Sequence, residues 1–194
     1  MKDLFPNITV IAITGKIGSG KSEATNILKE LGAHRIDCDE IVHSLYKPEA
    51  LGTQKIETFF GKTLMDKNGG VDRKKLAKIL YKREKKWTIL NRLIHPLVAH
   101  ELRTQLQRIK KGIVVIEIQI YNDRLFKPFI DELWTIETLE EIRKERLKQR
   151  GLTPEQIEII GRQQTPPKSA TRHITNNETE ETLKITLKKI LNSL

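Results

Sequence analysis

Cysteine is nearly absent from this chain of 194 residues, in which Cys38 is the single example. One thiol cannot form an internal disulfide, and a zinc site built on several cysteines is excluded for the same reason. Long apolar runs are missing as well, because the run at residues 8–13 is far too short to span a membrane or to form the core of a usual signal peptide. These absences lead us to expect a cytoplasmic protein with no membrane partner.

Acidic and aromatic residues are also scarce. The chain has 25 Asp and Glu against 35 Lys and Arg, a formal net charge of +10, and only 5% of its residues are aromatic. Such a surplus attracts polyanions, which include nucleic acid, an anionic membrane surface and small molecules with several phosphates. Composition alone favours nucleic acid, yet the chain has neither a recognisable nucleic-acid-binding motif nor aromatic residues interleaved with the basic ones.

Segments typical of strands and of helices alternate along the chain. Apolar, β-branched strings predict strands at 8–13, 33–37, 113–116 and 133–136, with a last short strand around Ile174. A long basic helical pattern covers 72–92, and a second helix is expected to follow His95-Pro96. The alternation predicts an α/β fold with a mainly parallel sheet flanked by helices.

Residues 15–22 match the phosphate-loop pattern G-x-x-x-x-G-K-[S/T] in full, with a predicted strand before them and a predicted helix after them. Glycines let several backbone N–H groups point at a phosphate beside a helix N-terminus. A glycine-rich turn beside a surface lysine explains the glycines but not the Lys21-Ser22 pair. Lys21 can reach the outer phosphates as a catalytic cation, and the Ser22 hydroxyl can coordinate Mg²⁺. The residues we predict to bind ATP are Gly15, Ile17, Gly18, Ser19, Gly20, Lys21 and Ser22.

Three acids follow the predicted strand ends, namely Asp37, Asp39 and Glu117. Phosphoryl transfer needs an acid that binds the metal and often another that positions or deprotonates the attacking hydroxyl. We interpret Asp39 as the base, Glu117 as an acid that orients Mg²⁺ directly or through water, and Asp37 as a group on the metal or substrate side. The alternatives are a helix N-cap for Asp39 and a simple ion pair with a nearby cation for Glu117.

Several short motifs, in their order and spacing, together resemble the dephospho-coenzyme A kinases, which perform the last step of coenzyme A synthesis. The segment Gly18-Ser19-Gly20-Lys21-Ser22 resembles the family loop, and Ile36-Asp37-Cys38-Asp39 resembles its I-D-A-D segment. Further similar stretches are Val71-Asp72-Arg73 with Leu76, Leu93-Ile94-His95-Pro96-Leu97-Val98, Arg146-Leu147 with Arg150-Gly151-Leu152, and Asn176 or Asn177 near the late V-I-x-N.

The resemblance implies a P-loop kinase fold of the nucleoside monophosphate kinase type. Its parts are expected as a core at about 1–45, 97–138 and 169–194, a helical substrate-binding insertion at about 46–96, and a lid at about 139–168. The implied reaction is the ATP-dependent phosphorylation of the ribose 3′-hydroxyl of dephospho-coenzyme A. By position, the residues implied on the acceptor side are Asp37, Asp39, Arg73, His95 and Glu117, and those implied to close on the phosphates of ATP are Arg146 and Arg150.

The chain departs from the family pattern at several positions. After the third strand the family usually has Asp-x-Pro, whereas this chain has Glu117-Ile118-Gln119. Glu23 replaces the usual threonine after the loop, and we predict that it points away from the triphosphate, which a facing carboxylate would repel. Lys16 replaces a common glycine. The segment 163–175 is shorter than usual, and the adenine contacts are left unassigned.

Two other functions stay open at the level of sequence. Because the insertion sets the acceptor, a P-loop kinase that acts on another nucleotide or nucleoside fits the same core. The basic helix at 72–92 also suits a nucleotide-gated nucleic-acid-binding protein. Nothing in the sequence assigns an oligomeric state.

Overall fold

The computed structural model describes residues 4–83, 85–164 and 167–194, and the chain forms two compact units. Unit 1 comprises Met1–Asp37 and Leu106–Leu194, and unit 2 comprises Cys38–Gln105. The division therefore falls between the predicted site residues Asp37 and Asp39. Residues 1–3 of the predicted core, residue 84 of the predicted insertion and residues 165–166 of the predicted lid lie outside the described residues.

Unit 1 is built on a sheet in which, within the described residues, five strands run in the order β2-β3-β1-β4-β5. The central strand β1 (Ile8–Thr14) pairs with β3 (Gly112–Glu117) and β4 (Glu132–Glu137), and β2 (His34–Asp37) and β5 (Arg172–Thr175) form the edges. Every pair is parallel. The α/β fold class predicted from the alternation of segments is thereby confirmed.

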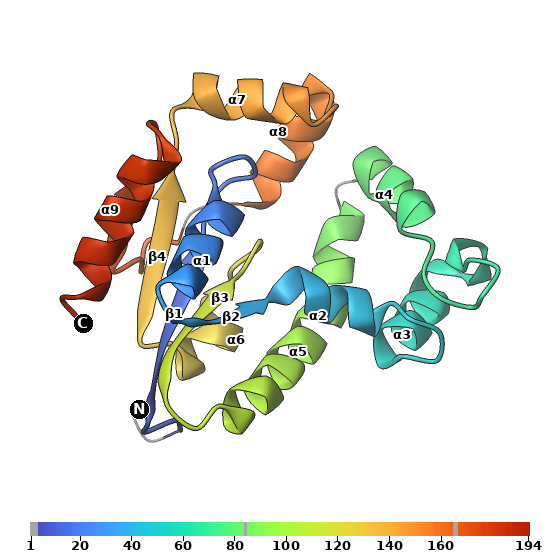
Figure 1. Cartoon of the computed structure of the whole chain (residues 1–194). Helices are drawn as coiled ribbons and strands as arrows, with labels where there is room; N and C mark the ends of the chain where they lie inside the picture. The colour runs from blue at the N-terminus through green and yellow to red at the C-terminus, as the bar shows by residue number, and fades with distance from the viewer. Residues whose placement is uncertain (1–3, 84, 165–166) are drawn as a thin grey trace. The chain divides into compact units, whose positions relative to one another are not determined.

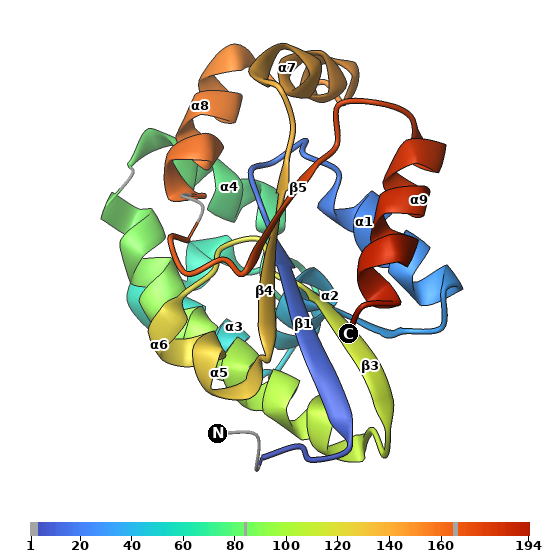
Figure 2. The same ribbon diagram turned by 90° about the vertical axis from the view of Figure 1, so that its left-hand side faces the viewer.

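The main core lies between the sheet and the helices α1 (Lys21–Glu30) and α9 (Glu180–Leu191), which lie side by side on one face of it (Figures 1 and 2). Burying each large aliphatic side chain of this layer contributes about 1.5–3 kcal/mol, so the apolar stripes of the two helices fix them on the strands. The packed residues include Ile11, Ile13, Ala24, Ile27, Leu28, Val115, Trp134, Ile136, Leu183 and Leu187.

Two helices follow β4 and lie beyond its carboxyl end in Figure 1, namely α7 (Glu140–Gln149) and α8 (Pro154–Gln163). α8 begins with a capping box, in which Thr153 and Gln156 exchange side-chain and backbone hydrogen bonds. Thr153 therefore defines the start of this helix. The connection from β3 to β4 contains α6 (Asp123–Phe126) and η2 (Lys127–Phe129).

Unit 2 is helical. Its elements are α2 (Cys38–Leu45), α3 (Leu51–Phe60), η1 (Lys62–Leu64), α4 (Arg73–Lys82) and α5 (Lys85–Arg108) as far as Gln105. None of the helices in the part of the chain that the structure describes is long and apolar enough to cross a membrane.

The expected helix start after His95-Pro96 is wrong, because α5 is continuous and contains Pro96 in its interior. An internal proline costs a helix about 3 kcal/mol, since it removes a hydrogen bond and crowds the preceding turn. The apolar face of α5 is buried before the proline at Ile94 and after it at Val98 and Leu102. Burial of this shared face outweighs the local cost and holds the two halves in one helix.

Candidate active site

The loop predicted to bind phosphate joins the carboxyl end of β1 to the start of α1. Gly15 has a φ of 148°, and a Cβ there would collide with the carbonyl oxygen of Ile136. Gly20 has a φ of 93°, and a Cβ there would collide with the side-chain amide of Asn176. Only glycine fits these two positions, so the backbone winds closely ahead of a helix N-terminus, where an anion is favoured.

The Lys21 side chain is almost fully buried against this loop, at 4% exposed. Its ammonium donates to the carbonyl oxygens of Gly15 at 2.9 Å and Lys16 at 3.1 Å. A cavity of about 310 Å³ opens beside it. This cavity brings together most of the predicted nucleotide residues, and its lining is Ile17, Gly18, Gly20, Lys21, Ser22, Glu23, Gln119, Arg146 and Arg150.

Of the two arginines of this cavity, Arg146 lies on α7 and Arg150 directly follows that helix. Nη1 of Arg146 is buried and has no hydrogen-bond partner among the described residues. A buried donor without an acceptor is costly, more so when it belongs to a charged group. With Lys21 in the same cavity, the unsatisfied Arg146 donor indicates that the cavity is built to receive an anion with several oxygens.

Another arginine of α7, which no sequence motif singles out, holds that helix against the loop. Arg143 is 4% exposed, and its Nη1 donates to the carbonyl oxygen of Ile17 at 3.1 Å. From the other side, the Ile17 amide donates to Oε1 of Gln164 at 2.5 Å. Both partners of Ile17 lie far from it in sequence, so local patterns could not reveal them.

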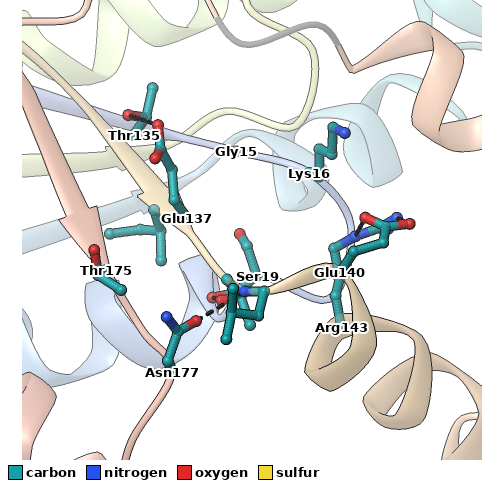
Figure 3. Close-up of a pocket in the computed structure, with 12 residues that line it drawn as sticks. Gly15, Lys16, Ser19, Thr135, Glu137, Glu140, Arg143, Thr175 and Asn177 are labelled. Atoms are coloured by element: carbon teal, nitrogen blue, oxygen red, sulfur yellow. Dashed lines mark hydrogen bonds and ion pairs between the residues drawn. The ribbon is translucent and has the colours of Figure 1, made fainter.

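A second cavity, of about 530 Å³, borders the same loop on the side of β4 and β5 (Figure 3). Gly15 and Ser19, two of the predicted nucleotide residues, line this cavity rather than the first one. In Figure 3, Asn177 reaches the start of α7, where its Oδ1 accepts a hydrogen bond from the Leu139 amide at 2.8 Å. The segment after β5 therefore closes this side of the loop.

The strand-end acid Glu117 contacts the phosphate loop directly. Glu117 is buried, and its Oε1 accepts a hydrogen bond from Ser22 Oγ at 2.6 Å. The register pairs Glu117 with Asp37 on the neighbouring strand, and Arg35 donates to Asp37 at 2.8 Å and to Glu117 at 2.9 Å. The ion pair proposed as an alternative for Glu117 is thus present together with its contact to Ser22.

The Ser22 hydroxyl and the Glu117 carboxylate suit a magnesium ion. Mg²⁺ prefers oxygen ligands and is usually bound by one or two protein groups together with substrate phosphates and waters. The described residues contain no group of three or more His, Cys, Asp or Glu side chains that could hold a metal by themselves. The donors therefore fit an ion that arrives with the nucleotide, and they do not fit a resident metal in an all-protein cage.

Glu23 lines the first cavity, so the expectation that it points away from the nucleotide site is wrong. Its Oε2 accepts a hydrogen bond from Nδ2 of Asn176 at 3.0 Å, and the same amide nitrogen donates to the Ser19 carbonyl at 3.0 Å. Asn176 thereby holds the carboxylate beside the loop. Asn176 follows β5, and this position allows the contact. The resemblance to the family's late V-I-x-N motif predicted an asparagine near this place but not its partner.

In unit 2, the charges of Asp39 and Arg73 both influence the pKa of the Tyr46 hydroxyl. Asp39 is exposed in the first turn of α2, which begins at Cys38, so the alternative that it forms the N-cap is wrong. Burial raises the pKa of Tyr46, the Arg73 guanidinium lowers it and the Asp39 carboxylate raises it again. The Val71 amide donates to the Tyr46 carbonyl at 2.9 Å, which brings the start of α4 to the end of α2.

His95 lies on α5, also within unit 2. Burial lowers the pKa of its imidazole, because a charged ring loses hydration in an apolar environment. The side chain is therefore neutral at pH 7. A neutral imidazole can donate one hydrogen bond and accept another, which suits contact with a polar substrate group.

Comparisons with known proteins agree with this geometry. The family model described as "Dephospho-CoA kinase" matches residues 9–181. A dephospho-CoA kinase of Coxiella burnetii is 33% identical over 160 residues, which cover 80% of this chain and 79% of the relative. One from Carboxydothermus hydrogenoformans is 34% identical over 147 residues, with 74% and 71% covered. The crystal structure of TT1252 from Thermus thermophilus has a TM-score of 0.71 at 26% identity, and covers 97% of this chain and 98% of that chain.

Proposed function

Because the chain belongs to the dephospho-CoA kinase family, we propose that it transfers the γ-phosphoryl group of ATP to the ribose 3′-hydroxyl of dephospho-coenzyme A. The products are coenzyme A and ADP, which makes this the last step of coenzyme A synthesis. The observation that carries the proposal is the cavity at the phosphate loop, which Lys21, Arg146 and Arg150 line together. Such a cavity suits a polyphosphate far better than a neutral ligand.

The transfer is a displacement at the γ-phosphorus. The ribose 3′-oxygen forms a bond to phosphorus, the bond to the β–γ bridging oxygen breaks, and ADP leaves with that oxygen. The hydroxyl proton passes to a base, for which we propose the Asp39 carboxylate. Lys21, Arg146 and Arg150 are placed in this proposal to stabilise the negative charge that spreads over the transferring oxygens.

Ser22 and Glu117 are proposed to hold the magnesium ion of Mg·ATP through their oxygens, which lie 2.6 Å apart. When bound, Mg²⁺ supplies charge neutralisation for the phosphate oxygens. The chain's own contribution is to fix the two oxygen donors at the first turn of α1. Backbone amides from Gly15 to Ser22 are proposed to bind the phosphates, and α7 and α8 to serve as a lid that excludes water.

Unit 2 is proposed to bind the acceptor. Arg73 and His95 are assigned to contacts with dephospho-coenzyme A, and Asp37 to the acceptor side of unit 1. The combined influence of Asp39 and Arg73 on Tyr46 supports a polar acceptor surface on α2 and α4. The large positive charge of the chain then serves two polyphosphate ligands, since a positive field draws both toward the protein.

The decisive experiment measures ADP release by the purified protein with Mg·ATP across a panel of acceptors. The panel contains dephospho-coenzyme A, several nucleoside monophosphates and several nucleosides. We expect turnover with dephospho-coenzyme A alone. Turnover with a monophosphate or nucleoside, and none with dephospho-coenzyme A, would overturn the acceptor assignment in favour of another P-loop kinase. Lys21→Met serves as the control for contaminating kinases, because it lacks the cation of the loop.

We further propose that the protein works in the cytoplasm, where ATP is made and spent. The presence of only one cysteine in the chain supports a reducing compartment.

A further inference from the structure

The two oxygens of the buried Glu117 carboxylate have separate sets of partners. Oε1 accepts from Ser22 Oγ at 2.6 Å and from Gln119 Nε2 at 3.3 Å, and both donors line the cavity at the phosphate loop. Oε2 accepts from Arg35 Nη2 at 2.9 Å and from Thr25 Oγ1 at 3.2 Å, on the side of β2 and the second turn of α1. One oxygen therefore contacts two residues that line the cavity, and the other contacts Arg35 and Thr25, which we call the anchor.

Arg35 is the centre of that anchor. Its Nε donates to Thr25 Oγ1 at 3.0 Å, and its Nη2 is shared between Asp37 Oδ2 at 2.8 Å and Glu117 Oε2. The side chain of Arg35 is only 18% exposed and that of Glu117 only 2%. A planar guanidinium with bonds at both Nε and Nη2 fixes direction as well as charge, which a flexible ammonium does not.

The anchor matters because Glu117 is long. A glutamate has one more rotatable bond than an aspartate at the same strand position, so its carboxylate has more orientations to lose. A carboxylate buried to this extent also needs a compensating charge. Arg35 serves both needs, since it supplies a positive charge, which Glu117 shares with Asp37, and binds Oε2 so that Oε1 is directed at Ser22.

We propose that Arg35 is a positioning residue for the magnesium ion of Mg·ATP, acting through Oε2 of Glu117 to aim Oε1 at the Ser22 hydroxyl. The inference rests on the proposed use of Mg·ATP, but not on the identity of the acceptor. Arg35 is not one of the residues that line the first cavity. Its effect is therefore on metal-assisted nucleotide binding and not on direct contact with phosphate.

A matched control is available at the other edge of the same sheet. Arg172 on β5 donates from Nε to Glu132 Oε2 at 2.9 Å, with the two side chains 35% and 22% exposed. This pair has the same chemistry and nearly the same length as the pair of Arg35 and Glu117, and neither Arg172 nor Glu132 lines the phosphate-loop cavity. Arg172→Met therefore removes an ion pair at a strand edge and leaves the contacts of Glu117 unchanged.

The test measures the dissociation constant of ATP by calorimetry, without acceptor, once with Mg²⁺ and once with EDTA. For Arg35→Met we expect the tightening caused by Mg²⁺ to shrink by about 10-fold or more, as is typical when a group supporting a metal ligand is lost. The affinity in EDTA should stay close to that of the wild type. Arg35→Lys should recover part of the Mg²⁺ effect, and Arg172→Met should keep all of it.

If Arg35→Met does not fold, Thr25→Val removes one donor to Oε2 at almost constant volume and should reduce the Mg²⁺ effect several-fold, as expected for a supporting hydrogen bond. A full Mg²⁺ effect in Arg35→Met would overturn the proposal. If Thr25→Val is measured instead, a full Mg²⁺ effect in that variant would overturn it. Equal losses with Mg²⁺ and with EDTA, the same loss in Arg172→Met, or no Mg²⁺ effect in the wild type would also overturn it. A wild type that binds Mg·ATP more tightly than ATP, yet never phosphorylates dephospho-coenzyme A, would refute the acceptor assignment and leave the role of Arg35 intact.

Discussion

The guanidinium of Arg143 donates from Nη1 to the carbonyl oxygen of Ile17 at 3.1 Å, across 126 positions of sequence. The same group holds both oxygens of Glu140, from Nε at 3.0 Å and from Nη2 at 2.6 Å. The first turn of α7 is therefore hydrogen-bonded to the phosphate loop. Arg146 lies one turn further along that helix and Arg150 directly follows its end, so fixing the helix helps to place both side chains at the cavity.

Arg143→Met should both destabilise the protein and weaken ATP binding. The change leaves the Ile17 carbonyl without its donor, which lowers the free energy of unfolding by about 1–3 kcal/mol. It also frees α7, so we expect the dissociation constant of ATP to rise. Urea unfolding and calorimetry check the two effects. Arg162→Met removes an exposed pair with Glu158 on α8 and should change stability by less than about 1 kcal/mol. Wild-type ATP affinity in Arg143→Met would disprove the anchoring role.

Glu23→Thr should tighten ATP binding. The carboxylate lines the phosphate-loop cavity, and removing a like charge near the triphosphate is worth about 1 kcal/mol, or roughly five-fold in affinity. Calorimetry at low ionic strength measures the gain. Glu30→Thr is the matched control, because Glu30 is the last residue of the same helix and forms an ion pair there with Lys184. Equal effects of the two substitutions, or weaker binding by Glu23→Thr, would contradict this account.

Gly20→Ala should abolish ATP binding and destabilise unit 1. A methyl group there collides with Asn176, and the φ of 93° is unfavourable for alanine. Gly161→Ala, in the interior of α8 with open space around it, should instead stabilise the protein by about 1 kcal/mol. Thermal unfolding with and without Mg·ATP separates the outcomes. Ligand-induced stabilisation that survives in Gly20→Ala would refute the tight loop geometry.

His95 should make the protein less stable in mild acid. Burial lowers its folded-state pKa below the ordinary value of 6.5, so the unfolded chain binds more protons below that pH. The contribution to stability is complete above pH 6.5 and falls as the pH drops toward the lowered pKa. Urea unfolding at about pH 7.5 and about pH 5.5 should show a smaller loss in His95→Gln than in the wild type. His100→Gln, exposed on the same helix, should behave like the wild type, and an unchanged loss in His95→Gln would reject the assignment.

Local sequence signals predicted the parts of this molecule that local forces determine. The run from Gly15 to Ser22 sets its own backbone geometry, and it joins a strand to a helix as expected. Pro96 was misread as a break because the burial that keeps α5 continuous is a property of its packing. The bond from Arg35 to Glu117 joins residues 82 positions apart, and only the register of two strands brings them together.

The same distinction applies to Glu23. Its place in the first turn of α1 was evident, but its orientation depends on Asn176, which lies 153 positions away. Strand pairing and helix docking therefore determine the contacts that sequence patterns could not supply.

The position of the transferred phosphate tests the proposed function most directly. A ³¹P NMR spectrum of the wild-type protein with Mg·ATP and dephospho-coenzyme A should show ADP and a new monophosphate ester on the ribose 3′-oxygen, in equal amounts. A parallel spectrum for Asp39→Asn should show neither product, although that variant still binds ATP. Phosphate on any other oxygen, or ADP accompanied only by inorganic phosphate, would contradict the proposed reaction.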